Sequence, residues 1–386
     1  MEIALEKDKI TVALLWPRYG GEVTSVNDLV VGLKKDRFKA VFIFLSGYGV
    51  GKNILEEAGY EVFYLSNARR IPGFRLSILF RLVKILKEHH VDVLHCHRHK
   101  PTVYGVIAAV FAHTPVVMSH VHGMNRSRNF RRKLLNFVLF RKISRIVTVA
   151  NSVKEDVLRY NWFLSSEKVF VLENSVDYER FSHVSTSKED ARKRLGLASE
   201  AVVFGTVGRL APTKGQVYLI EAFAKVKRKL PGSVLLLVGA GRLENVLKRE
   251  ASKAGFVESI HFLGQRDDVP QILRAFDVFV FPSINEAFGL ALAEAMVAEI
   301  PCIATWVGGI PEVTNGDETC ILVPPRDSEA LAETMLRVAK MRGEELAEVI
   351  EKARDRVRRF YSHDVVREKL RDLYLCELGK VVRKER

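Results

Sequence analysis

The segment VFVFPSINEAFGLALAEAMVAEIPCIA, residues 278–304, decides the fold class. Its first four residues are β-branched or aromatic, which predicts a buried strand over 278–281. Pro282 ends that strand, residues 290–297 have the apolar periodicity of a helix, and the apolar run at 301–304 predicts another strand. A strand, a helix and a strand in one short span are typical of a parallel sheet that is buried on both faces.

The same alternation extends through the rest of the chain. Further apolar runs predict strands over residues 11–16, 40–46, 61–65, 91–95, 116–119, 145–149, 169–172, 202–207, 234–238, 260–263 and 320–323. Helix-period segments lie among them, including residues 25–35, 76–88, 218–230, 243–254 and 328–341. Because the series occurs twice, we expect an α/β protein with two Rossmann-like, doubly wound parallel-sheet domains.

A polar segment at residues 182–201 separates the two series and is the best candidate for the domain boundary. We therefore expect one domain over residues 1–185 and a second over residues 186–350. The sequence then continues as a helical, charged segment, so residues 351–386 are expected to form a C-terminal helical tail that packs across the domains.

Composition excludes several classes of protein. The chain has 386 residues, 48% of them hydrophobic and 27% charged, which is too apolar for a disordered chain. Its four cysteines form no CxxC pair, which argues against a zinc module or a disulfide framework. No run approaches the roughly 18–20 apolar residues that span a bilayer, and the first residues are acidic where a signal peptide is basic. We expect a soluble, cytoplasmic globular protein.

The charge is concentrated in the first half of the chain. The whole chain has 60 Lys and Arg against 46 Asp and Glu, a net charge of +14. Residues 1–180 hold 28 cations and 17 anions, whereas residues 181–386 hold 32 and 29. Such asymmetry indicates that the first half meets an anionic partner: a nucleic acid, a phosphorylated ligand or a membrane surface.

Two carboxylates flank the predicted start of the helix at 290–297. Glu286 lies in the loop before the helix and Glu294 lies inside it. The unpaired backbone amides at a helix start, from about Ala287 onward, suit a phosphate, whereas carboxylates suit sugar or ribose hydroxyls. The alternative is that Glu286 caps the helix and Glu294 is a solvated surface residue.

Cations and glycines follow two other strands. In GTVGRLAPTKG, residues 205–215, Arg209 and Lys214 lie at the expected carboxyl edge of the sheet, where an Arg and a Lys can neutralise a diphosphate. Two solvated loop cations are the alternative. In the first domain Gly20 and Gly21 allow backbone to approach a ligand, but neither they nor GAGRLE at 239–244 completes a GxGxxG dinucleotide motif.

Together these segments resemble the retaining glycosyltransferases of family 4, the glycogen-synthase-like group with the GT-B fold. Glu286 and Glu294 match the E-x7-E motif of that family, and Arg209 and Lys214 match its GRL-x-x-x-KG signature. Further matches in the second half are LLLVGAGRLE at 235–244, GQRDDVPQIL at 264–273, DVFVFPS at 277–283 and VGGIPEV at 307–313. Looser matches in the first half are Gly20-Gly21, DVLHCH at 92–97, residues 116–123 and ENSVDYERF at 173–181.

The resemblance implies a role for each matching residue around a cleft that the two domains face. Arg209 and Lys214 would hold the donor diphosphate, Glu294 the ribose hydroxyls, and Glu286 the transferred sugar. The remaining donor contacts that it implies are Ala287, Phe288, Gly289 and Leu290 at the helix start, Gln265 at the base, and Gly20 and Gly21 at the phosphates. The family histidine that contacts the donor sugar corresponds to His120 or His122, and the choice stays open at this stage.

The resemblance also implies a reaction. A sugar would move from a nucleotide-diphosphate sugar, such as a UDP- or GDP-sugar, to an acceptor with retention of configuration, by front-face attack. No D-x-D motif occurs, so we expect no metal site and no cofactor, with fixed positive charge in place of a cation. The alternatives are a GT-B sugar-nucleotide epimerase, a phosphorylase, and a non-catalytic nucleotide-sugar-binding partner of a polysaccharide assembly.

The basic excess of the first half gathers in RSRNFRRKLLNFVLFRKISR, residues 126–145, which has eight cations, an apolar middle and no acid. Such a helix can lie on an anionic membrane, which predicts a lipid-linked or cell-envelope glycan acceptor at the inner face of the cytoplasmic membrane. The alternative is a helix with its apolar side in the core. We expect no nucleic acid, because neither stacking aromatics nor a known binding module accompanies the charge.

Overall fold

The computed structural model describes residues 9–19, 25–35, 37–49, 51, 53–124 and 129–384. The chain forms two compact units. One unit comprises residues 1–175 together with residues 363–386, and the other comprises residues 176–362.

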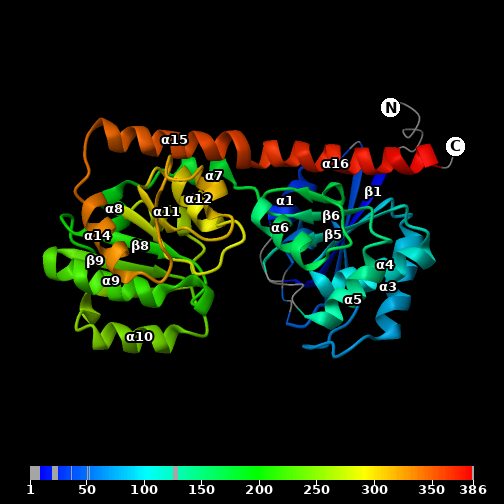
Figure 1. Ribbon diagram of the computed structural model, residues 1–386, viewed down its shortest axis with the longest axis horizontal. Coiled ribbons are helices and arrows are strands. Elements are labelled where there is room, and N and C mark those ends of the chain that lie inside the picture. Colours follow the sequence, from blue (N-terminus) through cyan, green and yellow to red (C-terminus); the bar gives the residue numbers. More distant parts are fainter. Residues whose placement is uncertain are drawn as a thin grey trace. The chain divides into compact units, whose positions relative to one another are not determined.

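Each unit is built on one parallel sheet (Figure 1). The seven strands of the first sheet, in the order β3-β2-β1-β4-β5-β6-β7, are β1 (Ile10–Arg18), β2 (Phe38–Ser46), β3 (Glu61–Tyr64), β4 (Val93–His97), β5 (Val116–Val121), β6 (Arg145–Thr148) and β7 (Val169–Val171). The six strands of the second sheet, in the order β10-β9-β8-β11-β12-β13, are β8 (Val202–Val207), β9 (Ser233–Val238), β10 (Ile260–Gly264), β11 (Val278–Phe281), β12 (Cys302–Thr305) and β13 (Ile321–Val323). Both orders are those of the Rossmann fold, which confirms the predicted doubly wound architecture.

Helices connect the strands and cover both faces of each sheet (Figure 1). In the first unit they are α1 (Ser25–Val31), α2 (Ile54–Glu57), α3 (Leu76–Glu88), α4 (His99–Ala112), α5 (Phe130–Leu139), α6 (Asn151–Tyr160) and α16 (His363–Lys384). In the second unit they are α7 (Tyr178–Ser182), α8 (Lys188–Arg194), α9 (Gln216–Lys229), α10 (Glu244–Lys253), α11 (Val269–Leu273), α12 (Leu290–Val297), α13 (Ile310–Thr314), α14 (Ser328–Val338) and α15 (Glu344–Tyr361). Short 3-10 turns occur at η2 (Ser166–Lys168), η3 (Pro212–Lys214) and η4 (Val257–Ser259). Within the described ranges, no helix has the length and apolar character needed to cross a bilayer.

The apolar runs of the sequence form the core because a parallel sheet covered by helices buries both of its faces. In the first unit two apolar clusters lie on opposite faces of the sheet: Ala13 and Leu15 of β1 belong to one, and Val12 and Leu14 to the other. In the second unit a large cluster includes Phe204 of β8 and Val280 of β11.

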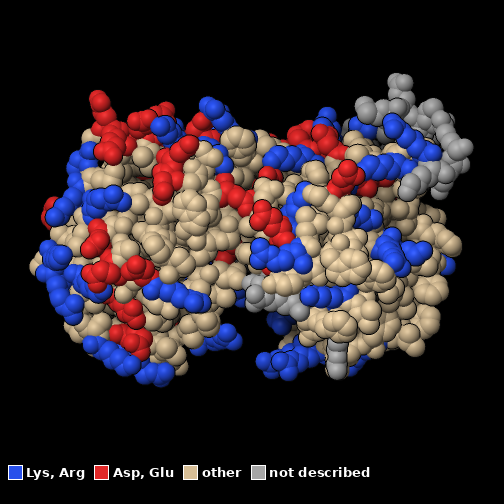
Figure 2. All heavy atoms as spheres, viewed as in Figure 1, with Lys and Arg blue, Asp and Glu red and all other residues tan. Residues whose placement is uncertain are grey.

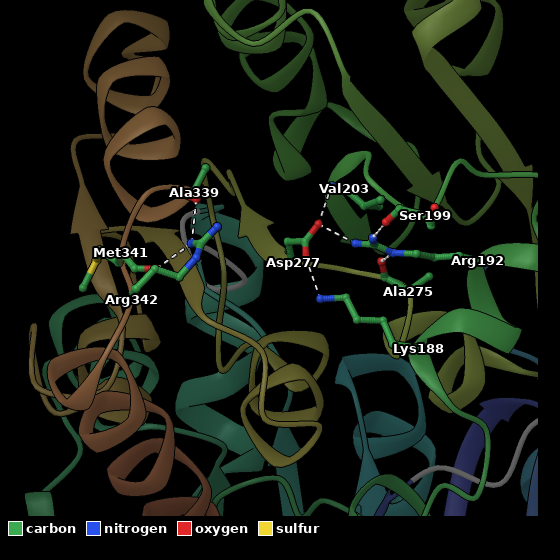
Figure 3. Close-up of polar contacts among 9 residues, drawn as sticks. All are labelled: Lys188, Arg192, Ser199, Val203, Ala275, Asp277, Ala339, Met341 and Arg342. Carbon is green, nitrogen blue, oxygen red and sulfur yellow. Dashed lines mark hydrogen bonds and ion pairs between the residues drawn. The ribbon is translucent and has the colours of Figure 1, made fainter.

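The polar segment 182–201, predicted as the domain boundary, is instead part of the second unit. It contains α8, whose Arg192 donates to Asp277 at 2.6 Å, ahead of β11 (Figure 3). The same carboxylate accepts from the backbone N–H of Val203 at 2.7 Å and from Lys188 at 2.5 Å (Figure 3). These bonds fasten α8 to the sheet, so the compact units divide after Ser175 rather than at the expected residue 185.

The predicted tail at 351–386 divides at Ser362. Helix α15 packs on α12 and α13 of the second unit. Helix α16 belongs to the first unit, where Leu370 and Tyr374 join the apolar cluster that contains Phe42 of β2. The tail therefore contributes to the core of each unit, because both of its helices have an apolar side that must be buried.

Replacing Asp277 by alanine is expected to destabilise the second unit by about 3 kcal/mol, because the buried guanidinium of Arg192 loses its anionic partner. Urea unfolding followed by circular dichroism measures the change. Asp268→Ala is the matched control, since Asp268 forms an exposed ion pair with Arg266. Equal losses for the two variants would contradict the assigned role of Asp277.

Candidate functional site

Two loops that carry predicted site residues meet at the switch point of the second sheet. The strand order places β8 beside β11, so the connections run in opposite directions from this pair. Ligands of doubly wound sheets bind outside the carboxyl ends of the strands at such a point. Lys214 follows β8 and Glu286 follows β11, so the fold brings both to this edge.

The two loops touch through their backbones. The N–H groups of Ile284 and Asn285 donate to the carbonyl of Thr213 at 2.8 and 3.2 Å. Gly215 has a φ of +66°, and a Cβ on it would lie 1.9 Å from the carbonyl oxygen of Pro282. Only glycine allows this approach, since it has no Cβ and adopts the left-handed conformation without strain.

The contact brings Lys214 to Glu286. The ammonium of Lys214 forms an ion pair and a hydrogen bond with Oε2 of Glu286, and it also lies 5.1 Å from the ring centroid of Phe281. The hydroxyl of Ser283 donates to the same carboxylate oxygen at 3.4 Å. The side chains of Lys214 and Glu286 are 20% and 15% exposed, so a ligand can reach both groups while water screens them only partly.

The loop that carries Glu286 leads into α12. The helix begins at Leu290, and its N-cap Gly289 has a φ of +104° and supplies no side-chain hydrogen bond to the helix start. Glu286 therefore does not cap the helix, because its carboxylate is directed at Lys214. The backbone carbonyl of Glu286 accepts from Gly309, which holds the loop against the segment before α13. Phe288 is buried with its ring edge-on to Tyr361, with the ring centroids 5.2 Å apart.

The other predicted donor contacts of the second unit lie at or near the same edge of the sheet. Arg209 is exposed in the loop after β8, and its carbonyl accepts from Gln216 at 2.9 Å. Glu294 is half-buried in the middle of α12, and it is therefore not a fully solvated surface residue. Ala287 is half-buried before α12, and Gln265 is exposed directly after β10.

In the first unit, the equivalent switch point lies between β1 and β4. Gly20 and Gly21, which the sequence places in the loop after β1, lie outside the described residues. Trp16 near the end of β1 stacks on His97 at the end of β4, with the ring centroids 3.7 Å apart and an interplanar angle of 4°. Nδ1 of His97 in turn lies 3.0 Å from Nε2 of His122, just beyond β5.

The structure separates the two candidate histidines by their access to solvent. His120 is 1% exposed within β5, whereas His122 is half-buried. Burial is the main cause that lowers the pKa of His120 well below its ordinary value, and the neighbouring His122 and His95 lower it further. Since a ligand can reach only an accessible ring, the structure favours His122 over His120 as the candidate donor contact.

Two further histidines, His95 and His97, lie beside His120 and are not among the predicted site residues. Both are fully buried in β4, on the same face as His120. The sequence does contain a pattern that predicts this cluster: the spacing His-x-His occurs in DVLHCH and again in SHVHG. Alternate residues of a strand point to the same face of a sheet. The expected strands ended at residues 95 and 119, before either pattern was complete.

Comparison with known proteins identifies the family. The family "Glycosyltransferase Family 4" matches residues 19–180, and "Glycosyl transferases group 1" matches residues 187–356. The UDP-Gal:alpha-D-GlcNAc-diphosphoundecaprenol alpha-1,3-galactosyltransferase of Escherichia coli is 31% identical over 272 residues, which cover 68% of this chain and 70% of that protein. The chain belongs to the family 4 glycosyltransferases.

Other similar proteins agree with this membership. This glycosyltransferase is 24% identical to the GDP-mannose-dependent alpha-(1-6)-phosphatidylinositol monomannoside mannosyltransferase of Mycobacterium tuberculosis, over 83% of this chain and 85% of that one. Among solved structures, that of Anabaena Alr3699/HepE in complex with UDP superimposes with a TM-score of 0.82 at 21% identity, covering 94% of this chain and 99% of that one. The likeness confirms the GT-B fold.

Gly215→Ala is expected to destabilise this glycosyltransferase by at least 1–2 kcal/mol, roughly the cost of a left-handed conformation for an L-residue, with the contact to Pro282 adding to it. Gly232→Ala is the matched control, because a Cβ there meets nothing within 4 Å. Chemical denaturation of both variants gives the comparison. An unchanged midpoint for Gly215→Ala would show that the two loops do not need this close approach.

Proposed function

We propose that this glycosyltransferase transfers a sugar, with retention of configuration, from a nucleotide-diphosphate sugar to a lipid-linked or cell-envelope glycan. The proposal rests on one observation above the others. A cation and a carboxylate, Lys214 and Glu286, are held together at the switch point beside a helix start that has no side-chain cap. A diphosphate and a sugar need these two kinds of group side by side.

In this proposal, positively charged groups of the site bind the diphosphate of the donor. An ammonium has three N–H donors, so Lys214 can keep its bond to Glu286 and still donate to a phosphate oxygen. The exposed guanidinium of Arg209, in the same loop, can add a bidentate contact. The amides at the start of α12 contribute the positive end of the helix dipole. These fixed positive charges stabilise a leaving diphosphate, and we propose that no metal ion is needed there.

Hydrogen-bonding side chains of the site would bind the sugar and the ribose of the donor. Glu286 is an acceptor that is already oriented by Lys214 and Ser283, so it can receive sugar hydroxyls without reorganising. Glu294, in α12, is the corresponding acceptor for the ribose hydroxyls. His122 is the accessible histidine of the first unit, and we assign it to the donor sugar near the reacting carbon.

Retention follows from the way the acceptor can attack. The acceptor hydroxyl attacks the anomeric carbon on the face from which the diphosphate leaves, and the leaving phosphate oxygen takes the hydroxyl proton. The anomeric C–O bond to phosphate breaks as the new C–O bond forms, so no enzyme nucleophile is required. The names of the Escherichia coli and Mycobacterium tuberculosis relatives describe α-linked products, which are the products of retention when the donor sugar is α-linked to its diphosphate.

The surface of α5 supports a membrane-borne acceptor. Phe130, Leu134 and Val138 are spaced four residues apart and are 76%, 61% and 59% exposed. The alternative predicted from the sequence, an α5 with its apolar side in the core, holds for Leu139 and for Phe140 just after the helix, which are buried in a core cluster, but not for Leu134 and Val138. Trp162, which is 83% exposed, extends this apolar surface, since its ring stacks near that of Phe137.

Cations accompany this surface. Arg132, Arg141 and Lys142 are exposed within or just after α5, whereas Arg126 and Arg128 of the basic segment lie outside the described residues. Figure 2 shows cations and uncharged side chains over the part of the first unit that holds α5, while acidic side chains gather over the second unit and along α15 and α16. Apolar residues flanked by cations fit an anionic lipid surface. The two relatives named above act, by their names, on diphosphoundecaprenol- and phosphatidylinositol-linked sugars.

Arg209→Ala and Glu286→Ala are each expected to lower sugar transfer about 100-fold or more, since each removes a preorganised charge from the reacting centre. The measurement is transfer or slow hydrolysis across a panel of UDP- and GDP-sugars, with the anomer of the product read by NMR. Arg249→Ala, an exposed cation on α10, is the matched control. Near-normal turnover of either site variant would refute the assignment, and an inverted product would refute retention.

Leu134→Asp combined with Val138→Asp is expected to weaken binding to vesicles that contain anionic lipid by roughly tenfold or more, because each substitution removes an apolar side chain from the lipid contact. Vesicle cosedimentation at low and high salt measures the binding. Val257→Asp, at an exposed apolar position of the second unit, serves as the control. Binding that depends on neither anionic lipid nor salt would argue against the membrane assignment.

A further inference from the structure

Four histidines form an array on one face of the first sheet. His95 and His97 are alternate residues of β4, and the register places His97 opposite His120 of β5. His122 follows two residues after His120. The rings lie close together: the centroids of His95 and His97 are 4.6 Å apart, those of His120 and His122 are 4.2 Å apart, and those of His95 and His120 are 5.2 Å apart.

Three of these rings are buried with nitrogen atoms that have no partner. Within the described part of the chain, no hydrogen-bond partner reaches Nε2 of His95, Nε2 of His97, or either nitrogen of His120. The three residues are at most 1% exposed. A buried polar atom without a hydrogen-bond partner lowers the free energy of unfolding. Four such atoms in one cluster therefore indicate a ligand that binds several of them at once.

The opposite ring nitrogens of two of these histidines are already engaged. Nδ1 of His95 lies 2.7 Å from the hydroxyl of Tyr374 in α16, and Nδ1 of His97 lies 3.0 Å from Nε2 of His122. A histidine that binds a metal through one nitrogen almost always donates its other N–H to a neighbouring group, which fixes the ring and its tautomer. His95 and His97 both show this arrangement, each with Nε2 left over.

We propose that His95, His97 and His120 form a binding site for one divalent transition-metal ion of the Zn²⁺ type. Imidazole nitrogen favours Zn²⁺ and similar ions over Mg²⁺ and Ca²⁺, which take oxygen ligands. Each of the three residues offers one ligand nitrogen, and these nitrogens all lie within 4.8 Å of one another.

Closing the site requires the rings to turn. Their planes lie within 8°, 25° and 32° of one another, whereas the in-plane lone pairs of three metal ligands must converge on one ion. With Zn–N bonds of about 2.0–2.1 Å, the nitrogens of a tetrahedral site lie about 3.3 Å apart, so binding is expected to rotate the side chains and bring the nitrogens together. Three protein ligands leave a fourth position for water or hydroxide.

The site would act on the neighbouring His122. Binding of a metal to Nε2 of His97 leaves the proton on Nδ1, which then donates to Nε2 of His122. This fixes His122 in one tautomer, with its Nε2 accepting. The metal site uses only residues of the first unit, so the inference stands whether or not the proposed sugar transfer is correct.

The test uses the full-length protein without a histidine tag, stripped of metal and then titrated with Zn²⁺ alone and with Co²⁺ alone. We expect one ion per chain by elemental analysis, the visible absorption of four-coordinate Co²⁺, and thermal stabilisation by Zn²⁺ but not by Mg²⁺. His97→Ala and His120→Ala are expected to abolish stoichiometric binding. The surface variant His183→Ala, whose ring is 73% exposed, should bind as the unaltered protein does.

Tyr374→Phe keeps the apolar packing of α16 and removes only the hydroxyl that faces His95, so it remains informative if a histidine variant fails to fold. It is expected to weaken Zn²⁺ affinity about 10–100-fold, the usual effect of losing the partner of a metal ligand. Absence of stoichiometric Zn²⁺ binding would overturn the proposal. So would binding that survives His97→Ala and Tyr374→Phe unchanged, in which case ordered waters would be the ligands of the free nitrogens.

Discussion

The backbone contact between the loop after β8 and the loop after β11 is the constraint on which the proposed donor site depends. Gly215 lies against the carbonyl of Pro282 so closely that no side chain fits there. This approach brings Lys214 within reach of Glu286, and the hydrogen bonds from Ile284 and Asn285 to Thr213 keep it there. A cation and a carboxylate far apart in the sequence become one preorganised unit because the strand order reverses between β8 and β11.

The switch point of the first sheet has histidines where that of the second sheet has an ion pair. Here the carboxyl ends of β4 and β5 carry an array of stacked histidines, which contacts Trp16 and Tyr374 of helix α16. Such an array is expensive to bury unless its nitrogens are satisfied, which explains why α16 supplies a hydroxyl to His95. The C-terminal helix is therefore more than a cover for an apolar face, since it also sets the environment of the histidines.

Sequence patterns predicted most of the fold because each strand buries both faces and so appears as an apolar run. Strands β8 and β11 and helices α3 and α12 have the predicted bounds. The expected domain boundary differs from the observed one for a physical reason. Residues 182–201 are polar and mostly exposed, but they include α8, which Arg192 and Lys188 fasten to Asp277, so the segment is not a linker. An ion pair with a distant residue and a solvated cation look alike in a sequence.

Residue types and spacings by themselves determined the two Rossmann-like sheets and the family. They also pointed to four candidate donor-binding residues, Arg209, Lys214, Glu286 and Glu294. Those features depend on local periodicity and on short motifs, which a sequence displays directly. Only the tertiary structure decided that Lys214 pairs with Glu286, that His120 is buried while His122 is accessible, and that His95, His97 and Tyr374 belong together. These depend on the register of β4 against β5 and on the return of α16, and such non-local pairings leave no periodic trace in the chain.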